Sequence, residues 1–208
     1  DKREGWRVIL IDRNDYHAHV PLLYDVATAY FGREESGEPQ LRAGCAIKLN
    51  EILPPGVQFV QGEVRSVDCK TQEVVITSSS SPLPKEEKFK YDYLVLALGS
   101  AIDFFDIPGL AEQAHTFGSV LDAIRLRRLI RDCLAKPVSE KNRSPLAIVV
   151  GGGGATGVEF ACELAALFHH LERQGALKRG AWEMMLVEAS RRILPPLPLR
   201  ASQIAHRR

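Results

Sequence analysis

One short run of glycines constrains the fold of this chain more than any other feature. The pattern Gly152-x-Gly154-x-x-Gly157 lies between an apolar stretch at 146–150 and a helical pattern at 158–171. In a strand–turn–helix unit the first glycine permits a tight turn and the second lets a pyrophosphate approach the backbone. The third lets the helix pack close to the strand. The helix N-terminus then offers free N–H groups and a partial positive charge to the phosphates. The run therefore predicts a dinucleotide-binding turn, in preference to a merely flexible glycine-rich loop.

Two acidic residues are placed to act with this turn. A further strand is expected at 184–188, ending in Glu188. A carboxylate there can accept both ribose hydroxyls of an adenosine and repels a 2′-phosphate, which favours NAD. Arg191 and Arg192 follow closely and keep NADP open as the alternative. Glu159 follows the last glycine by two residues, so it is either stabilised by the helix dipole or faces a cleft where a nicotinamide meets a second cofactor.

The first half of the chain shows a second, incomplete version of this pattern. Short apolar stretches predict strands at 8–11, 57–60, 64–67, 74–77 and 93–98. The stretches 64–67 and 74–77 are expected to pair as a β-hairpin. Asp12 ends the first strand, a position that binds an adenosine ribose in a dinucleotide fold. The glycine turn that should precede it is not in this chain, and Asp12 taken alone is more often a turn residue.

Two helices are expected outside the glycine-turn unit. Pro21 opens a helical pattern whose apolar face comprises Leu22, Leu23, Val26, Ala27 and Tyr30. Ser119 is a candidate N-cap, with Asp122 in the capping-box position of the helix that follows. With the strand–turn–helix–strand order after residue 146, these elements predict an α/β fold. It has two Rossmann-like halves, both incomplete, with a β-hairpin insertion in the first.

Composition excludes several classes of function. A net charge of +1 gives no reason to expect a nucleic acid partner. The four cysteines are far apart in the sequence, and the six histidines form no HExxH motif. We therefore expect no metal site, no disulfide framework and no dithiol redox centre. The sequence contains no run of 18 apolar residues, so we expect no transmembrane helix.

Four segments, in order along nearly the whole chain, resemble the type II NADH dehydrogenases. These are flavoproteins with two dinucleotide-binding domains that pass electrons from NADH through FAD to a quinone. The segments are LIDRNDYH (10–17) with PLLYDVA (21–27), YDYLVLALGS (91–100), VVGGGGATGVE (149–159) and LVEASRRILP (186–195). The first and third are quite specific to that family.

The resemblance implies a role for each candidate site residue. Those implied to contact FAD are Asp12 at the ribose, the segment 21–27 along the flavin, the backbone of Val64 at the adenine, and the strand end from Ala97 to Gly99. Those implied to hold NADH are Gly152, Gly154, Gly157 and Glu188. Glu159 matches the acid beside the nicotinamide–flavin contact, and is the candidate catalytic residue.

The chain also departs from the family. Leu98 replaces a usual Thr and Ala155 a usual Pro. The first strand and its FAD phosphate turn are missing, and the later segments of the family are absent too. We therefore expect an internal fragment, with residues 1–114 a partial FAD-binding domain and 115–208 a partial NAD-binding domain. Expressed alone, it should be soluble and should not retain FAD.

The resemblance further implies partners and a location for the full-length parent. A quinone would be its electron acceptor, and a C-terminal part absent here would contact the membrane surface. The parent would be cytoplasmic and peripheral on the inner membrane, and a homodimer is possible.

Two other functions remain open. A disulfide or sulfide oxidoreductase would need a cysteine pair, and none here has suitable spacing. The other is a non-enzymatic remnant that binds NAD(H). For the chain as a stand-alone polypeptide this function fits better than the enzyme does, since half of the FAD site is missing.

Overall fold

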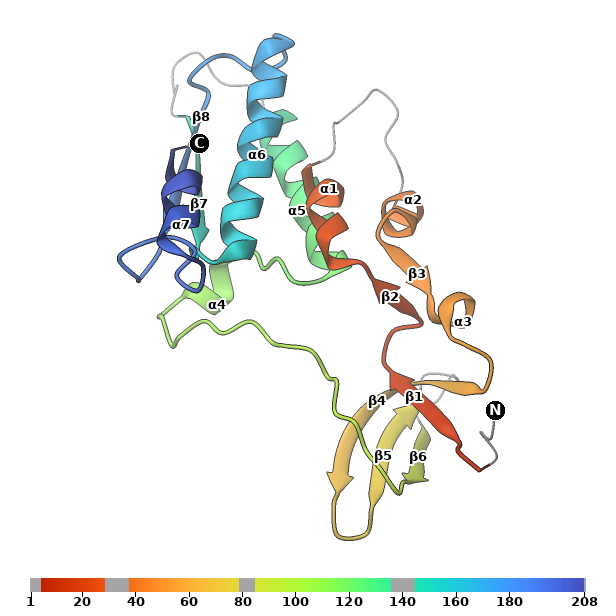
Figure 1. Ribbon diagram of the computed structural model, residues 1–208. Helices are drawn as coiled ribbons and strands as arrows, with labels where there is room; N and C mark the ends of the chain where they lie inside the picture. The colour runs from red at the N-terminus through yellow and green to blue at the C-terminus, as the bar shows by residue number, and fades with distance from the viewer. Residues whose placement is uncertain (1–4, 29–37, 79–84, 136–144, 208) are drawn as a thin grey trace. The chain divides into compact units, whose positions relative to one another are not determined.

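The computed structural model describes residues 5–28, 38–78, 85–135 and 145–207, and it separates into two compact units (Figure 1). The first unit comprises Asp1–His19 and Ala46–Ala114, and the second comprises Val20–Cys45 and His115–Arg208. One boundary, after Ala114, falls where the sequence suggested a division. Val20–Cys45, however, packs with the second unit, so the units are not two consecutive halves of the chain.

A four-stranded mixed sheet forms the centre of the first unit. Its strands, in spatial order, are β1 (Val8–Asp12), β4 (Val57–Asp68), β5 (Glu73–Ser78) and β6 (Lys85–Lys90). The predicted strands at 57–60 and 64–67 are a single strand, β4, which changes partner along its length. Residues 57–61 pair in parallel with β1, and the part from Gly62 onward pairs antiparallel with β5. The predicted hairpin is thus confirmed, and β6 extends it by one strand.

Smaller elements complete the first unit. Strands β2 (Tyr16–Ala18) and β3 (Ala46–Lys48) pair antiparallel. The short helix α3 (Leu49–Ile52) follows, and the Leu49 N–H donates to the Asp15 carbonyl at 2.8 Å. Helix α4 (Leu110–Gln113) begins after Gly109, whose φ of 78° is in the left-handed region that favours glycine.

The prediction of a buried strand at 93–98 is wrong. These residues belong to no strand, and the side chains of Tyr93, Val95 and Leu98 are 78%, 86% and 76% exposed. An apolar stretch is buried as a central strand only when neighbours pair with it on both edges. In the part of the chain that the structure describes, the sheet ends at β1 and β6, and neither pairs with this segment. Its apolar sequence therefore did not decide its structure.

The second unit contains the predicted βαβ element. Strands β7 (Leu146–Gly151) and β8 (Trp182–Val187) pair in parallel, from Leu146 opposite Trp182 to Gly151 opposite Val187. Helix α6 (Ala155–Arg173) connects them, as Figure 1 shows in cyan to blue. The helix begins three residues before the predicted start at 158, because the glycine run itself supplies its first turn. Helix α7 (Leu199–His206) follows β8.

Residues 20–45 belong to the second unit because their apolar face is buried there. The 3-10 turn η1 (Val20–Leu22) leads into α1 (Leu23–Thr28), which packs against α5 (Val120–Ala135) and α6; α2 (Glu38–Ala43) also lies in this unit. Leu23 and Ala27 of α1 are fully buried, as the helical pattern predicted, but Leu22 is exposed, and Tyr30 lies outside the described residues. The buried Arg127 of α5 donates from Nη1 to the Val26 carbonyl at 3.5 Å, and burial lowers the pKa of its guanidinium.

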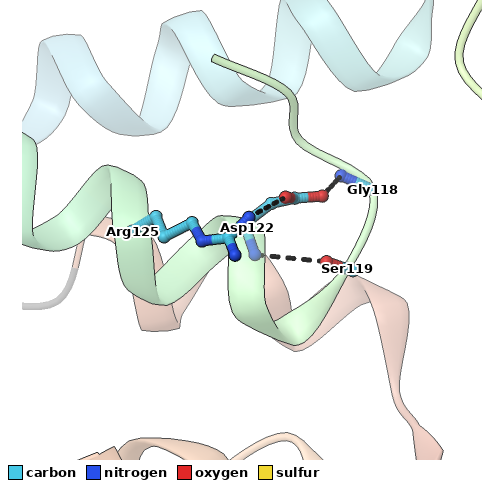
Figure 2. Close-up of polar contacts among 4 residues, drawn as sticks. All are labelled: Gly118, Ser119, Asp122 and Arg125. Carbon is cyan, nitrogen blue, oxygen red and sulfur yellow. Dashed lines mark hydrogen bonds and ion pairs between the residues drawn. The ribbon is translucent and has the colours of Figure 1, made fainter.

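The N-terminus of α5 is capped by side chains, as predicted (Figure 2). The Asp122 N–H donates to Ser119 Oγ at 3.1 Å. The Asp122 carboxylate accepts from the Gly118 N–H at 3.3 Å and pairs with Arg125 at 3.9 Å. In a standard capping box the carboxylate reaches the amide of the N-cap residue itself. Here the shorter Asp side chain bonds to the residue before the cap.

Candidate functional site

The glycine turn connects β7 directly to the N-terminus of α6. The Gly152 N–H donates to the Val187 carbonyl at 2.8 Å, which extends the β7–β8 pairing into the turn. Gly152 has a φ of +103°, a conformation that side chains rarely allow, so the predicted tight turn requires this glycine. Gly154 is the N-cap of α6, and its carbonyl accepts from the Val158 N–H at 3.0 Å.

The other glycines of the turn differ in what surrounds them. A Cβ on Gly154 would meet no atom within 4 Å, so open space lies beside the start of the helix. A Cβ on Gly157 would overlap the Gly152 carbonyl oxygen and lie 3.6 Å from Val150 Cγ1. Gly157 therefore permits close packing, as predicted, but mainly against the turn's own backbone.

Glu188 lies directly after β8 and is bound to the glycine turn. Its Oε2 accepts from the Gly153 N–H at 2.6 Å, and its Oε1 accepts from the Ser190 N–H at 2.7 Å. The amides of Ser190 and Gly153 lower the pKa of this carboxyl, because both stabilise the charged form. The strand-end acid is therefore an ionised group held beside the turn.

Gly153 is a site residue that the sequence motif treats as variable. A Cβ there would lie 2.9 Å from Glu188 Cβ and 3.0 Å from Oε2, so glycine is needed for the two to approach. The consecutive glycines from 151 to 154 are the only trace of this requirement in the sequence.

The arginines after Glu188 differ in their environment. Arg192 donates from Nη2 to the Pro195 carbonyl at 2.6 Å and from Nη1 to the Leu194 carbonyl at 3.2 Å. The Leu194 N–H in turn donates to the Gly153 carbonyl at 2.6 Å. Arg192 thus holds the loop at Leu194 and Pro195, which contacts the glycine turn through Gly153. Arg191 is exposed.

Glu159 lies on α6, which packs against α1. Burial, followed by the influence of Glu159, raises the pKa of the Tyr24 hydroxyl on α1, and Thr156 opposes this rise. The Tyr24 ring packs 5.1 Å from that of Phe117, which lies 4.8 Å from Phe160. No spacing in the sequence predicted that α1 packs against α6.

Of the candidate FAD residues, Asp12, Val64, Ala97 and Gly99 belong to the first unit, whereas the segment 21–27 belongs to the second unit. Asp12 is exposed at the end of β1, and its Oδ1 accepts from the Asn14 N–H at 2.8 Å, which is the contact of a turn residue. Val64 is half-buried in β4 where the register shifts. Ala97 and Gly99 are exposed and not at a strand end, contrary to prediction; Gly99 has a φ of +76°.

The described residues offer few alternative sites. Among them, no group of three or more His, Cys, Asp or Glu side chains could hold a metal ion. All four cysteines lie in the described ranges, and each is a free thiol. None of the helices in those ranges is long and apolar enough to cross a membrane.

The fold and the site define a class of protein. A parallel strand pair joined through a glycine turn and helix, with an acid after the second strand, is the arrangement of dinucleotide-binding proteins. Comparison with known families gives the particular one. Residues 2–208 match the pyridine nucleotide-disulphide oxidoreductases, so the chain belongs to this family.

Individual relatives agree with the resemblance inferred from the sequence. The chain is 33% identical over 199 residues to the mitochondrial external alternative NADH-ubiquinone oxidoreductase of Yarrowia lipolytica, covering 92% of this chain and 33% of the relative. It is 30% identical over 190 residues to the type II NADH:quinone oxidoreductase of Staphylococcus saprophyticus, covering 90% and 43%. The predicted resemblance is confirmed, and the chain spans less than half the length of either relative.

A solved structure supports the fold. The structure of NDH2 from Plasmodium falciparum in complex with NADH superposes with a TM-score of 0.77 at 21% identity. The match covers 96% of this chain and 40% of that one. The predicted Rossmann-like α/β fold is confirmed.

Proposed function

We propose that this chain forms the NADH-binding part, and some of the FAD-binding part, of an enzyme that oxidises NADH and passes the electrons to a quinone. The observation that carries the proposal is the glycine turn at the N-terminus of α6 with the ionised Glu188 held against it. The names of the two relatives, which both include NADH and a quinone, support the reaction.

The NADH pyrophosphate would bind at the start of α6. The first amide groups of a helix have no partner within it, and the helix dipole favours an anion there. The open space beside Gly154 lets a phosphate approach these amides. Gly152 and Gly157 shape the turn that presents them. The chain's own residues thus fit a dinucleotide.

Glu188 would bind the adenosine ribose and set the preference for NADH. A carboxylate accepts hydrogen bonds from ribose hydroxyls and repels a 2′-phosphate. Two backbone amides hold Glu188 in its ionised form, so both effects operate at neutral pH. Arg192, one of the two arginines that kept NADP open, donates instead to backbone carbonyls of the following loop. We therefore expect NADH to bind more tightly than NADPH.

FAD would be held in part by the first unit, through Asp12, Val64, Ala97 and Gly99. The exposed Asp12 carboxylate at the end of a parallel strand is suited to a ribose. When bound, FAD supplies the redox chemistry that couples a two-electron donor to a quinone. Glu159 would lie beside the nicotinamide, as the candidate catalytic residue. We assign residues 1–114 mainly to FAD and 115–208 to NADH.

Disulfide chemistry, which the family's name includes, is less well supported for this chain. The four free cysteines lie on separate elements: Cys45 after α2, Cys69 in the β4–β5 turn, Cys133 on α5 and Cys162 on α6. A quinone acceptor needs no cysteine pair. Peripheral association with the inner membrane and formation of a homodimer belong to the same proposal.

Nucleotide titration of the purified chain tests the proposal. NADH should bind about tenfold or more tightly than NADPH. Glu188→Gln should weaken the binding of NADH. It should also reduce the difference in affinity between NADH and NADPH, because the neutral amide no longer repels the 2′-phosphate. Glu183→Gln, on the exposed side of β8, is the matched control and should change neither affinity. Absence of NADH binding, or equal binding of NADPH by the unchanged chain, would contradict the proposal.

A further inference from the structure

We infer that Arg192 is a positioning residue for NADH: it holds a loop that fixes the backbone of Gly153, and Gly153 in turn fixes Glu188. The inference rests on the proposed NADH site and adds a residue to it. It gives Arg192 a role opposite to that of an arginine beside the ribose in an NADP-binding protein, which binds the 2′-phosphate.

The backbone of Gly153 is held on both sides of its Cα. Its N–H donates to Glu188 Oε2 at 2.6 Å. Its carbonyl accepts from the Leu194 N–H, also at 2.6 Å. Glycine has no side chain to limit its backbone rotation, so these two bonds determine where the Gly153 N–H points. The bond to Leu194 therefore helps to keep that N–H on the carboxylate.

The loop that carries Leu194 is strained, and Arg192 holds it. Leu194 has a φ of +52°, a conformation that is uncommon for residues other than glycine and exceptional for a bulky side chain. Such a conformation persists only where the surrounding structure holds it, and it is typical of ligand sites. Arg192 Nη1 donates to the Leu194 carbonyl at 3.2 Å, and Nη2 donates to the Pro195 carbonyl at 2.6 Å. The planar, rigid guanidinium thus fixes two consecutive carbonyls of the strained loop.

Glu188 can bind a ribose while both of its amide contacts remain. A carboxylate has about four positions that accept hydrogen bonds, two on each oxygen. The Gly153 N–H occupies one on Oε2, and the Ser190 N–H occupies one on Oε1. Each oxygen therefore keeps a position for one ribose hydroxyl. Ser190 is only two residues from Glu188, so it is the Gly153 contact that ties the carboxylate to the glycine turn.

The loss of Arg192 should affect NADH more than NADPH. Without the guanidinium the loop can leave its strained conformation, and Gly153 then loses its bond to Leu194. The carboxylate of Glu188 is no longer held against the turn, so it binds the ribose hydroxyls of NADH less well and repels the 2′-phosphate of NADPH less. An arginine that itself bound the 2′-phosphate would show the reverse, because its removal would weaken NADPH alone.

The link from Arg192 to Glu188 is tested first by titration, with no nucleotide present. In the chain labelled with ¹³C at the glutamate δ carbon, the Glu188 signal is identified by its loss in Glu188→Gln. The amides of Ser190 and Gly153 lower the pKa of Glu188. Arg192→Gln should raise this pKa, because the Gly153 N–H is no longer held on the carboxylate. Glu172, whose pKa is also lowered in the folded chain, is the internal control and should titrate as before. An unchanged pKa of Glu188 would overturn the inference.

The positioning role is tested by titration with NADH and NADPH. Arg192→Gln should weaken the binding of NADH about threefold to tenfold, as loss of one hydrogen bond does. NADPH should lose less affinity, so the ratio of the two affinities falls. Arg191→Gln removes the same charge from an exposed neighbour and is the matched control, which should not lower the ratio. Adding Arg192→Gln to Glu188→Gln should not lower the ratio further, because the arginine acts through the acid.

The outcomes separate this inference from the proposed function. A selective loss of NADPH in Arg192→Gln would identify an arginine that binds the 2′-phosphate. Equal losses of both nucleotides, or a further fall of the ratio in the double variant, would show that Arg192 does not act through Glu188. Each of these results would overturn the positioning role. Failure of the unchanged chain to bind NADH would contradict the proposed function, and the titration of Glu188 would still decide whether Arg192 holds the acid.

Discussion

Substitution of Gly157 by alanine tests the geometry of the turn most directly. Helix propensity alone predicts stabilisation, because alanine is favoured over glycine within a helix by about 1 kcal/mol. The structure predicts the opposite sign. The new Cβ would overlap the Gly152 carbonyl oxygen and lie 3.1 Å from its carbonyl carbon. Both obstructing atoms are backbone, so no side-chain rotation relieves the contact.

The size of the effect follows from these two opposing contributions. Overpacking costs about 1–3 kcal/mol, occasionally more. A backbone overlap belongs at the upper end of that range, so a net destabilisation of about 1–2 kcal/mol remains after the gain in helix propensity. In a chain of this length each kcal/mol lowers the melting midpoint by roughly 2–4 °C. Gly157→Ala should therefore melt roughly 2–8 °C below the unchanged chain.

Gly154→Ala is the matched control, since its Cβ would meet no atom within 4 Å. Alanine is a poorer N-cap than glycine, which costs only about 0.5 kcal/mol. Thermal unfolding followed by circular dichroism measures both variants, and titration with NADH follows. We expect Gly154→Ala to melt close to the unchanged chain but to lose affinity for NADH. A Gly157→Ala chain that melts at or above the original temperature would refute the predicted packing of the turn.

Three further changes probe other contacts. Gly153→Ala should displace Glu188 and weaken AMP as well as NADH, measured by titration; unaltered AMP affinity would contradict the close approach of the two residues. The bond from His169, chiefly, lowers the pKa of Glu172 below its ordinary 4.5. The ionised Glu172 carboxylate therefore stabilises the folded chain fully above pH 4.5. This contribution is lost as the pH falls through the lowered pKa of Glu172. Glu172→Gln should flatten the fall in melting temperature on acidification, and an identical slope would argue against this assignment. Ser119→Ala should cost about 1 kcal/mol in urea unfolding, which Ser119→Asp restores if the cap acts as described.

The elements with local signals could be predicted from the amino-acid sequence alone. The β7–α6–β8 unit was predicted from the glycine spacing and from the apolar stretches on both sides. The same pattern placed Glu188 at the end of the second strand. The N-cap at Ser119 and the buried face of α1 followed from their neighbours in the chain. Such features depend on backbone conformation and side-chain periodicity over a few residues, so sequence patterns report them reliably.

Tertiary structure decided the features that depend on a distant partner. An apolar run becomes a central strand only if other strands pair with it. The apolar sequence of residues 93–98 therefore could not predict that their side chains are exposed. Residues 20–45 joined the second unit because α5 and α6 bury Leu23 and Ala27. Gly153 gained its importance from Glu188, which folding brings to it across a long separation in the chain. Spacing cannot encode such contacts, because the path of the chain between the two partners sets their distance.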